Sequence, residues 1–287
     1  MPELPEVETI KRELEKAVLG KKITEVCIHN PKVIRQPSVE KFKKGLEGAT
    51  IKNILRKAKM LILELSNGKS LLVHLKMTGQ LILRPKALSI NPKRGEGLIY
   101  PGSGKTSRVS FNFSDGEILD FNDRRLFAEL RLMDDWRDSK FIQALGPEPF
   151  DITVGQFKEM LSKKKTKIKP LLMDQTFISG VGNLYAAEVL FRARIHPERP
   201  AVSLSEKEKE ILFKEIRDTL DEAIKYKGSS VDQYVQLTGQ PGDYVKYHKV
   251  YDREGKACLN CREPIKRIAL GGRGTYFCPR CQKRQAK

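Results

Sequence analysis

The sequence MPELPE, residues 1–6, is the stretch around which we expect the chain to be organised. Met1 precedes a small residue, so excision of the methionine would leave Pro2 with a free secondary amine. An α-amine titrates near pH ~8, and a useful fraction is therefore nucleophilic at physiological pH. A secondary amine attacking a sugar C1′ gives an iminium ion, which is an electron sink for C–O cleavage, and Glu3 is close enough to move protons. The alternative is a solvated end before a helix, with Pro5 at the first helical position. These six residues alone favour the alternative.

A helix is predicted directly after this stretch. Between Glu6 and Leu19 the apolar residues fall at helical spacing, and Gly20 is a suitable end. These apolar residues are Val7, Ile10, Leu14, Ala17 and Val18. Such a helix would bury one face and hold the N-terminus that precedes it in a fixed place.

Length and charge limit the classes of protein that need to be considered. A chain of 287 residues is long for one core, so two domains are expected. Lys and Arg number 54 against 36 Asp and Glu, a formal net charge of +18. This excess predicts a polyanionic partner, first nucleic acid and second an anionic membrane surface. No apolar run reaches membrane-span length and no signal-peptide core is present, which predicts a cytosolic protein without a membrane partner.

Residues 22–133 have the pattern of short antiparallel strands. The predicted strands are Ile23–Ile28, Ile51–Arg56, Met60–Leu65, Ser70–Leu75 and Gln80–Leu83. Two sequences of hairpin type, SNG at 66–68 and SDG at 114–116, support a β-sandwich or barrel. The stretch from Lys86 to Ser107 is predicted to be a mobile loop, and its sequence GSGKT (102–106) is only a poor match to a phosphate-binding loop. Cys27 is predicted to be a small core residue.

The second half of the chain is predicted to be helical. A proline-rich stretch, 138–151, is the predicted linker. The helical patterns after it are Val154–Leu161, Lys169–Met173, Leu184–Arg192 and Ser205–Tyr226, the last beginning with a capping box formed by Ser205 and Glu208. The turn ISGVGN (178–183) predicts free amides suited to a phosphate, although an ordinary interhelical turn remains an alternative. Residues 228–243 are predicted to be a substrate-gating loop or a linker.

Four of the five cysteines form two CxxC pairs near the C-terminus. Cys258 and Cys261 are separated from Cys278 and Cys281 by sixteen residues, counted between Cys261 and Cys278. This spacing predicts one structural zinc ion in a closed four-thiolate shell, with a redox pair as the weaker alternative. A hairpin between the pairs would present Arg273 at its tip. Residues 256–287 carry nine basic side chains and one acidic one, which predicts contact with a phosphate backbone.

Four motifs resemble the bacterial formamidopyrimidine-DNA glycosylase family. They are PELPEVE (2–8), HLKMTGQL (74–81), DQTFISGVGNLYAAE (174–188) and GRGTYFCPRCQ (272–282), and they appear in the family's order. The resemblance runs from the start of the chain to Gln282 and is weakest over 86–106 and 228–243. It implies a bifunctional glycosylase and apurinic-site lyase of base excision repair that removes oxidised purines from double-stranded DNA by flipping the damaged nucleotide out. The resemblance implies that the DNA would lie in a cleft between the two halves of the chain. It also implies that the protein is a monomer.

The resemblance also implies a fold of class α+β in four parts. An N-terminal helix on an antiparallel β-sandwich would occupy 1–137, and 138–151 would be the linker. A helix–two-turns–helix domain would span 152–250. A β-hairpin zinc finger would span 251–287.

The family's functional residues can be placed one by one on this sequence. Pro2 would be the nucleophile and Glu3 the general acid/base, and Lys59 would lie near the reacting sugar and phosphate. Three further positions would fill the space left by the flipped base, and two would hold the phosphates around the lesion. The first three are Met77, Arg125 and Phe127, and the two are Asn183 and Arg273. Glu6 and Lys169 match family positions near the site with less defined roles.

Several positions depart from the family pattern and bear on the choice of lesion. Leu126 replaces a usual basic residue, Ala128 a usual glycine, Thr106 a common histidine, and Asp232 a frequent basic residue. Two alternatives stay open. One is a sister endonuclease VIII-type enzyme for oxidised pyrimidines, whose N-terminus usually reads PEGPE where this chain has Leu4. The other is a non-catalytic zinc-finger DNA-binding protein, which the intact Pro2 and Glu3 disfavour.

Overall fold

The computed structural model describes residues 1–85, 106–231 and 233–284. Residues 86–105 of the loop predicted at 86–107, most of the GSGKT sequence and Asp232 lie outside these residues. By their contacts the described residues divide into two units. Unit 1 contains residues 1–143 and 226–243, and unit 2 contains residues 144–225 and 244–287.

Unit 1 is a β-sandwich with a helix against it, as predicted. One sheet has the order β1-β7-β8-β6, with bounds Ile23–Ile28, Ser107–Phe113, Ile118–Asp123 and Gly79–Arg84. The other has the order β2-β9-β5-β4-β3, with bounds Ile34–Gln36, Glu129–Met133, Ser70–His74, Met60–Leu65 and Ile51–Lys57. All neighbouring strands are antiparallel except β2 and β9, which are parallel. The hairpins predicted at 66–68 and 114–116 join β4 to β5 and β7 to β8.

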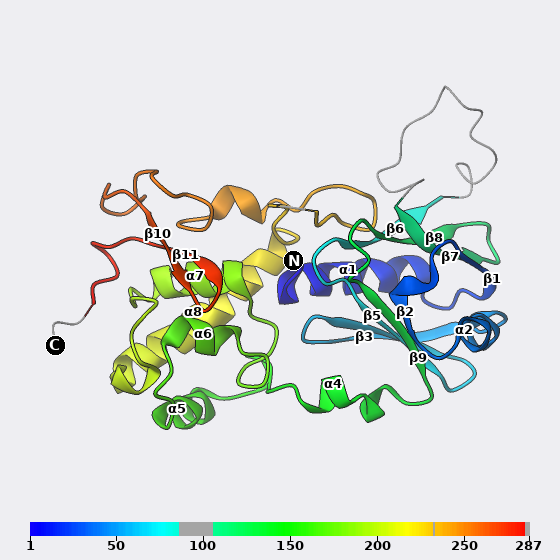
Figure 1. The fold of residues 1–287 in the computed structure, drawn as a ribbon, viewed down its shortest axis with the longest axis horizontal. Helices are drawn as coiled ribbons and strands as arrows, with labels where there is room; N and C mark the ends of the chain where they lie inside the picture. Colours follow the sequence, from blue (N-terminus) through cyan, green and yellow to red (C-terminus); the bar gives the residue numbers. More distant parts are fainter. Residues whose placement is uncertain (86–105, 232, 285–287) are drawn as a thin grey trace. The chain divides into compact units, whose positions relative to one another are not determined.

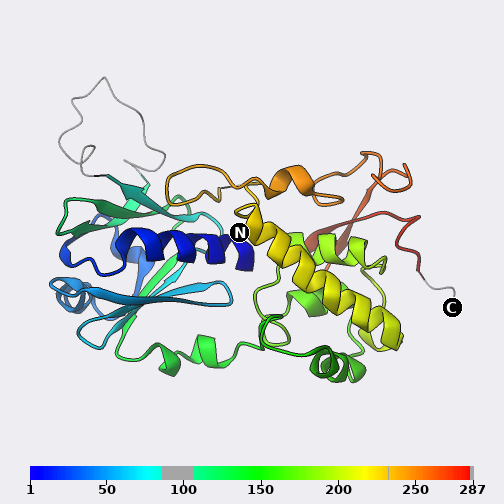
Figure 2. The ribbon, with the colours of Figure 1, turned by 180° about the vertical axis from the view of Figure 1, so that it is seen from behind.

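Helix α1, Leu4–Val18, runs next to both sheets (Figures 1 and 2). Its apolar residues Val7, Ile10, Leu14 and Val18 are at most 1% exposed and join the core that the two sheets share. A fully buried aliphatic side chain contributes roughly 1.5–3 kcal/mol. This helix is therefore firmly fixed, and so is the N-terminus that leads into it. Pro5 is the second residue of this helix, whereas the alternative interpretation placed it first.

Three features of unit 1 differ from prediction. Helix α2, Val39–Leu46, lies in a region predicted to be all strands, and it buries Phe42 and Leu46. Cys27 is half-buried in β1 and is not a core residue. The predicted linker is not wholly irregular, because α4, Lys140–Gln143, lies within it. Short 3₁₀ turns occur at Pro31–Val33 and Trp136–Asp138.

Residues 226–243 pack into unit 1, although the predicted division groups them with the helical domain. Tyr234 and Leu237 are buried in the sandwich core. The Leu237 amide donates to Glu13 of α1 (2.8 Å), and the Leu237 carbonyl accepts from the Leu83 amide (2.9 Å). The segment is therefore anchored at two points, and it is not a plain linker.

Unit 2 is a helical bundle with a two-stranded hairpin. Its helices match the predicted ones and are α5 Val154–Ser162, α6 Ile168–Met173, α7 Asn183–Arg192 and α8 Glu206–Lys225. The predicted capping box is present, with the Glu208 amide donating to Ser205 Oγ and the Ser205 amide to the Glu208 carboxylate. Short 3₁₀ turns occur at Ala201–Ser203 and Tyr244–Tyr247. Strands β10, Lys266–Leu270, and β11, Arg273–Phe277, form the predicted hairpin.

The hairpin and its cysteines pack onto α7. A buried cluster joins Ala187 and Phe191 of α7 to Val250, Ile265 and Cys278. The buried carboxylate of Glu188 accepts from the amides of residues 249, 250 and 251 at 2.8–2.9 Å. Helix α7 therefore fixes the position of the C-terminal segment within unit 2.

Candidate active site

The start of α1 places Pro2 and Glu3 at the end of a rigid element. Pro2 is buried, Glu3 is 5% exposed, and Met1 is 48% exposed. The Glu3 amide donates to Glu6 Oε2 at 2.7 Å, which closes the first turn of the helix. Removal of Met1 would leave the Pro2 nitrogen next in the chain to Glu3, whose backbone amide is already held by Glu6.

Lys59 lies in the tight turn between β3 and β4. Arg56 holds this turn to the N-terminal helix, because its Nε donates to Glu8 (2.8 Å) and its Nη1 to the Ala58 carbonyl (3.1 Å). Lys59 is 6% exposed. Burial lowers its pKa from the ordinary value, and the negative charges of Glu3 and Glu6 oppose that shift. The structure therefore brings Lys59 into the electrostatic neighbourhood of the N-terminal carboxylates.

Glu6 connects the N-terminus to residues 226–231. Its Oε1 accepts from the Ser229 amide at 2.9 Å, while its Oε2 accepts from Glu3. Gly228 has a φ of +75°, and a Cβ there would lie 2.8 Å from Glu6 Oε1. Only glycine accommodates both the backbone conformation and the close approach of this carboxylate. The family resemblance implies a place for Glu6 near the site, but the sequence does not reveal its partner, because nothing in a polar loop marks which amide meets a residue 223 positions earlier.

Met77, Arg125 and Phe127 form a cluster on the surface of unit 1. Met77 is 44% exposed and Phe127 is 49% exposed. Arg125 lies between them, with Nη1 3.2 Å from Met77 Sδ and its guanidinium carbon 4.8 Å from the centre of the Phe127 ring. We call these three residues the wedge cluster. Two large apolar side chains exposed on either side of one arginine are typical of a surface that contacts another molecule.

Lys169 and Asn183 meet the hairpin inside unit 2. The Lys169 Nζ donates to Asn183 Oδ1 at 2.5 Å and to Thr275 Oγ1 at 2.8 Å, and Asn183 Nδ2 donates to the Gly274 carbonyl at 3.2 Å. Arg273 is exposed at the first position of β11. The structure therefore brings Lys169 and Asn183 together, and it adds Thr275, which lies within the GRGTYF sequence but was not singled out.

The turn before α7 differs from the prediction of free amides. The Gly180 amide donates to Gln175 Oε1 at 3.0 Å, and Gln175 Nε2 donates to the Val181 carbonyl at 2.7 Å. The Gln175 side chain thus fills the turn, because a buried backbone amide needs a partner. The Gly180 amide is therefore not available for a phosphate.

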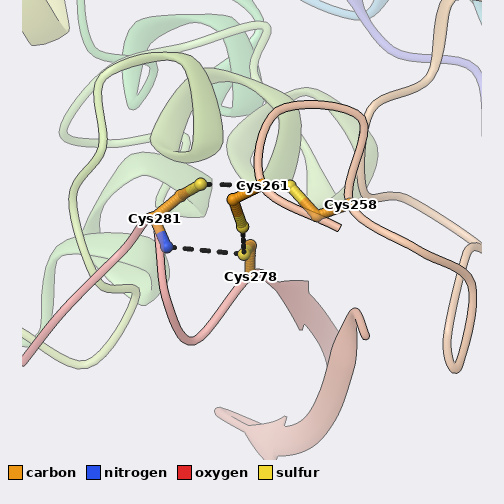
Figure 3. A group of neighbouring side chains, drawn as sticks. All are labelled: Cys258, Cys261, Cys278 and Cys281. Carbon is orange, nitrogen blue, oxygen red and sulfur yellow. Dashed lines mark hydrogen bonds between the residues drawn. The ribbon is translucent and has the colours of Figure 1, made fainter. Parts of the chain in front are cut away.

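Cys258, Cys261, Cys278 and Cys281 converge at one point (Figure 3). Their sulfur atoms all lie within 4.8 Å of one another. The pairs Cys258–Cys281 and Cys261–Cys278 are separated by 3.9 and 3.4 Å. Four thiolates at about 2.3 Å from one tetrahedral zinc ion lie roughly 3.8 Å apart, so this set fits one structural zinc ion with no position left for a substrate. Zinc here holds the hairpin that carries Arg273.

Comparison with protein families gives one consistent result along the chain. Residues 1–130 match the formamidopyrimidine-DNA glycosylase N-terminal domain. Residues 145–235 match the formamidopyrimidine-DNA glycosylase H2TH domain, and residues 255–284 match the zinc finger found in FPG and IleRS.

Individual relatives agree with the family matches. The chain is 42% identical to the formamidopyrimidine-DNA glycosylase of Pelotomaculum thermopropionicum, with 99% of each chain covered. It is 39% identical to that of Bacillus cereus, with 99% of this chain and all of the relative covered.

Solved structures of similar proteins include complexes with DNA. One is a Lactococcus lactis Fpg mutant bound to DNA containing Fapy-dG, with a TM-score of 0.86, 36% identity, and 99% and 100% of the two chains covered. Another is the MutM (Fpg) protein of Thermus thermophilus, with a TM-score of 0.83, 36% identity and 98% of each chain covered. Among the described residues, no helix is both long and apolar enough to cross a membrane.

Proposed function

The chain belongs to the formamidopyrimidine-DNA glycosylase family, and from this premise we propose that its reaction runs through the amine of Pro2. The protein is a DNA glycosylase and apurinic-site lyase of base excision repair that binds DNA and acts on oxidised purines.

In the proposed mechanism the Pro2 nitrogen attacks C1′ of the damaged nucleotide. The bond from C1′ to the base breaks, and the base leaves with the electron pair and a proton. The C1′–O4′ bond then breaks, O4′ takes up a proton, and the opened sugar is left with an iminium ion between C1′ and the Pro2 nitrogen. This ion carries a positive charge, because a secondary amine leaves no proton on nitrogen to lose. That charge acidifies the C2′ hydrogens, so β-elimination releases the 3′ phosphate, and δ-elimination then releases the 5′ phosphate.

Glu3 and Lys59 are assigned the proton transfers of this sequence. Both side chains are nearly buried, and the fixed first turn of α1 limits where the Glu3 carboxylate can move. A lysine of lowered pKa releases its proton more readily than an exposed one, so Lys59 can exchange a proton as well as face a phosphate. Glu6 is a positioning residue, since it holds the Glu3 backbone and the Ser229 backbone.

DNA binding is assigned to residues of both units. In unit 1 the wedge cluster would occupy the space that the flipped nucleotide vacates, because its exposed Met77 and Phe127 offer apolar surface to unstacked bases. In unit 2 Asn183 and Arg273 would bind phosphates, with Lys169 holding Asn183 in place. We further propose that the protein acts as a monomer on damaged double-stranded DNA in the bacterial cytosol, where its cysteines stay reduced for zinc.

The observation that carries the proposal is that Pro2 is buried at the start of a fixed helix and is followed by Glu3, whose charge acts on the buried Lys59 side chain. The test compares strand cleavage by the wild-type protein and by Pro2→Gly on two duplexes. One duplex carries 8-oxoguanine and the other carries thymine glycol. The wild type is expected to cut the 8-oxoguanine duplex faster, and Pro2→Gly to lose strand cleavage on both. Faster cleavage of thymine glycol would favour the pyrimidine-specific sister enzyme, and no cleavage of either would favour a binding protein.

A further inference from the structure

Asp123 is a fully buried carboxylate at the end of β8, two residues before Arg125 of the wedge cluster. Its Oδ1 accepts from the Arg125 amide at 3.1 Å, and its Oδ2 accepts from the Ala128 amide at 2.8 Å. Both amides belong to the turn that carries Arg125 and Phe127. The carboxylate therefore spans this turn from its first part to its last.

The same carboxylate also binds the loop that carries Met77. The hydroxyl of Thr78, the next residue, donates to Asp123 Oδ1. Thr78 Oγ1 lies 3.3 Å from the Arg125 amide, so hydroxyl, carboxylate and amide form one connected group. Asp123 thus joins two loops that are 45 residues apart in the sequence.

The surrounding backbone leaves little freedom for either loop. A Cβ at Gly79 would lie 2.8 Å from Ala128 Cβ and 2.5 Å from the Leu75 carbonyl oxygen. Leu126, in the middle of the wedge turn, has a φ of +59° and packs against the sandwich core. A leucine in this conformation is strained, and such strain persists only where surrounding contacts impose it. The Asp123 hydrogen bonds are contacts of that kind.

We propose that Asp123 and Thr78 are positioning residues that hold Met77, Arg125 and Phe127 ready for insertion before DNA arrives. Neither side chain is assigned a contact with DNA. A carboxylate that accepts from backbone amides and a hydroxyl fixes the backbone from which the wedge side chains project. Preorganisation of this kind removes an ordering cost that would otherwise oppose base flipping.

The inference rests on the proposed role of the wedge cluster, so its test must separate the two. Thr78→Val removes the hydroxyl with little change in shape, and Thr78→Ser restores it. Asp123→Asn replaces one acceptor oxygen by a donor that faces a backbone amide. Phe127→Ala removes the wedge side chain itself. The substrates are a duplex with a central abasic site and the same abasic strand alone, which has no partner strand to separate from.

The measured quantity is kcat/KM on the duplex divided by kcat/KM on the single strand. We expect Thr78→Val and Asp123→Asn to lower this ratio about tenfold, the order of one lost buried hydrogen bond, and Thr78→Ser to return it towards the wild-type value. The fluorescence of 2-aminopurine next to the lesion should rise more slowly in Thr78→Val, since it reports unstacking directly. Loss of folding in Asp123→Asn would leave the Thr78 pair as the test.

Two results would overturn the proposals separately. If Phe127→Ala lowers the ratio while Thr78→Val keeps both the wild-type ratio and the wild-type fluorescence rate, the positioning role is wrong and the wedge role stands. If Phe127→Ala also keeps the wild-type ratio, the wedge role is wrong, and the positioning role falls with it.

Discussion

At the scale of single residues, His74 shows how burial sets charge near the site. Its ring is 6% exposed, its Nδ1 accepts from the Lys76 amide at 3.0 Å, and Phe141 packs on it edge-to-face at 5.7 Å. Burial lowers the pKa of His74 to about 3, and the positive charges of Lys76 and Lys59 add to the shift while Glu129 opposes it. The imidazole therefore stays neutral where the unfolded chain would already bind a proton.

This shift predicts a loss of stability in acid. Between pH 6.5 and about 3 the unfolded state binds a proton at His74 that the folded state does not, so the free energy of unfolding falls as the pH falls. The contribution of one such group is at most about 1.4 kcal/mol per pH unit. His74→Asn keeps an acceptor for the Lys76 amide and cannot titrate. Denaturant unfolding from pH 6.5 to 4 should give a shallower slope for the variant, and equal slopes would contradict the assignment.

Residue chemistry could be predicted from the sequence where a motif carries it. The four cysteines have a characteristic spacing, and the structure brings them together as predicted. Lys169 and Asn183 lie within or near family motifs, and the structure joins them by a hydrogen bond. Thr275, Asp123 and Ser229 act through hydrogen bonds to residues distant in the chain. No local pattern marks such a partner, because the contact exists only after the strands have paired.

At the scale of elements, the central contact is that between α1 and residues 226–243. Glu6 and Glu13 of α1 accept from amides of this segment, and Tyr234 packs into the core behind them. A change in the segment should therefore reach the N-terminus. Gly228 faces Glu6 closely, since a Cβ there would lie 2.8 Å from Glu6 Oε1 and 2.9 Å from Glu6 Cγ.

Gly228→Ala and Gly48→Ala make a matched pair. Both glycines have a positive φ, +75° and +81°, but a Cβ at Gly48 would meet nothing within 4 Å. Gly48→Ala should cost about 1 kcal/mol for the backbone conformation alone and leave borohydride trapping of abasic DNA intact. Gly228→Ala should cost more and reduce the trapping rate, because it displaces the Glu6 carboxylate from the Glu3 amide. Equal trapping rates in the two variants would show that this contact does not position the N-terminus.

The elements themselves were predictable where the periodicity was long or the turns were strong. Helix α8 runs for 20 residues with a capping box, and the hairpins at 66–68 and 114–116 have asparagine or aspartate before glycine. Helix α2 was missed because it is only eight residues long and contains a glycine, a poor helix former. Gly45 is needed there, as a Cβ would lie 2.6 Å from Leu132 Cδ2. Close packing against a partner element, rather than intrinsic helix propensity, explains this helix.

At the scale of the whole molecule, the net charge of +18 attracts a polyanionic partner at long range. Each phosphate that a cation neutralises releases counterions, so binding should weaken steeply as salt rises. Arg273 is exposed at the tip of the zinc-held hairpin and is assigned one such contact.

Replacement of Arg273 tests this assignment through the salt dependence. Arg273→Ala should weaken binding to a lesion duplex and reduce the slope of log Kd against log salt by about 0.9. Arg273→Lys keeps the charge but loses the planar guanidinium group with its paired N–H donors. This variant should keep the salt slope of log Kd while binding DNA less tightly. The measurement is a titration by fluorescence anisotropy at several salt concentrations. A wild-type slope in Arg273→Ala would show that this side chain neutralises no phosphate.

The proposal that Pro2 is the nucleophile is tested most directly by locating the covalent bond between the protein and DNA. The fully active protein is incubated with a lesion duplex and borohydride, digested with nuclease and protease, and its N-terminal peptide is mapped by mass spectrometry. We predict that Met1 is absent and that the reduced sugar remnant is attached to the nitrogen of Pro2. A remnant on Lys59, or Met1 retained on fully active protein, would show that the Pro2 amine is not the nucleophile.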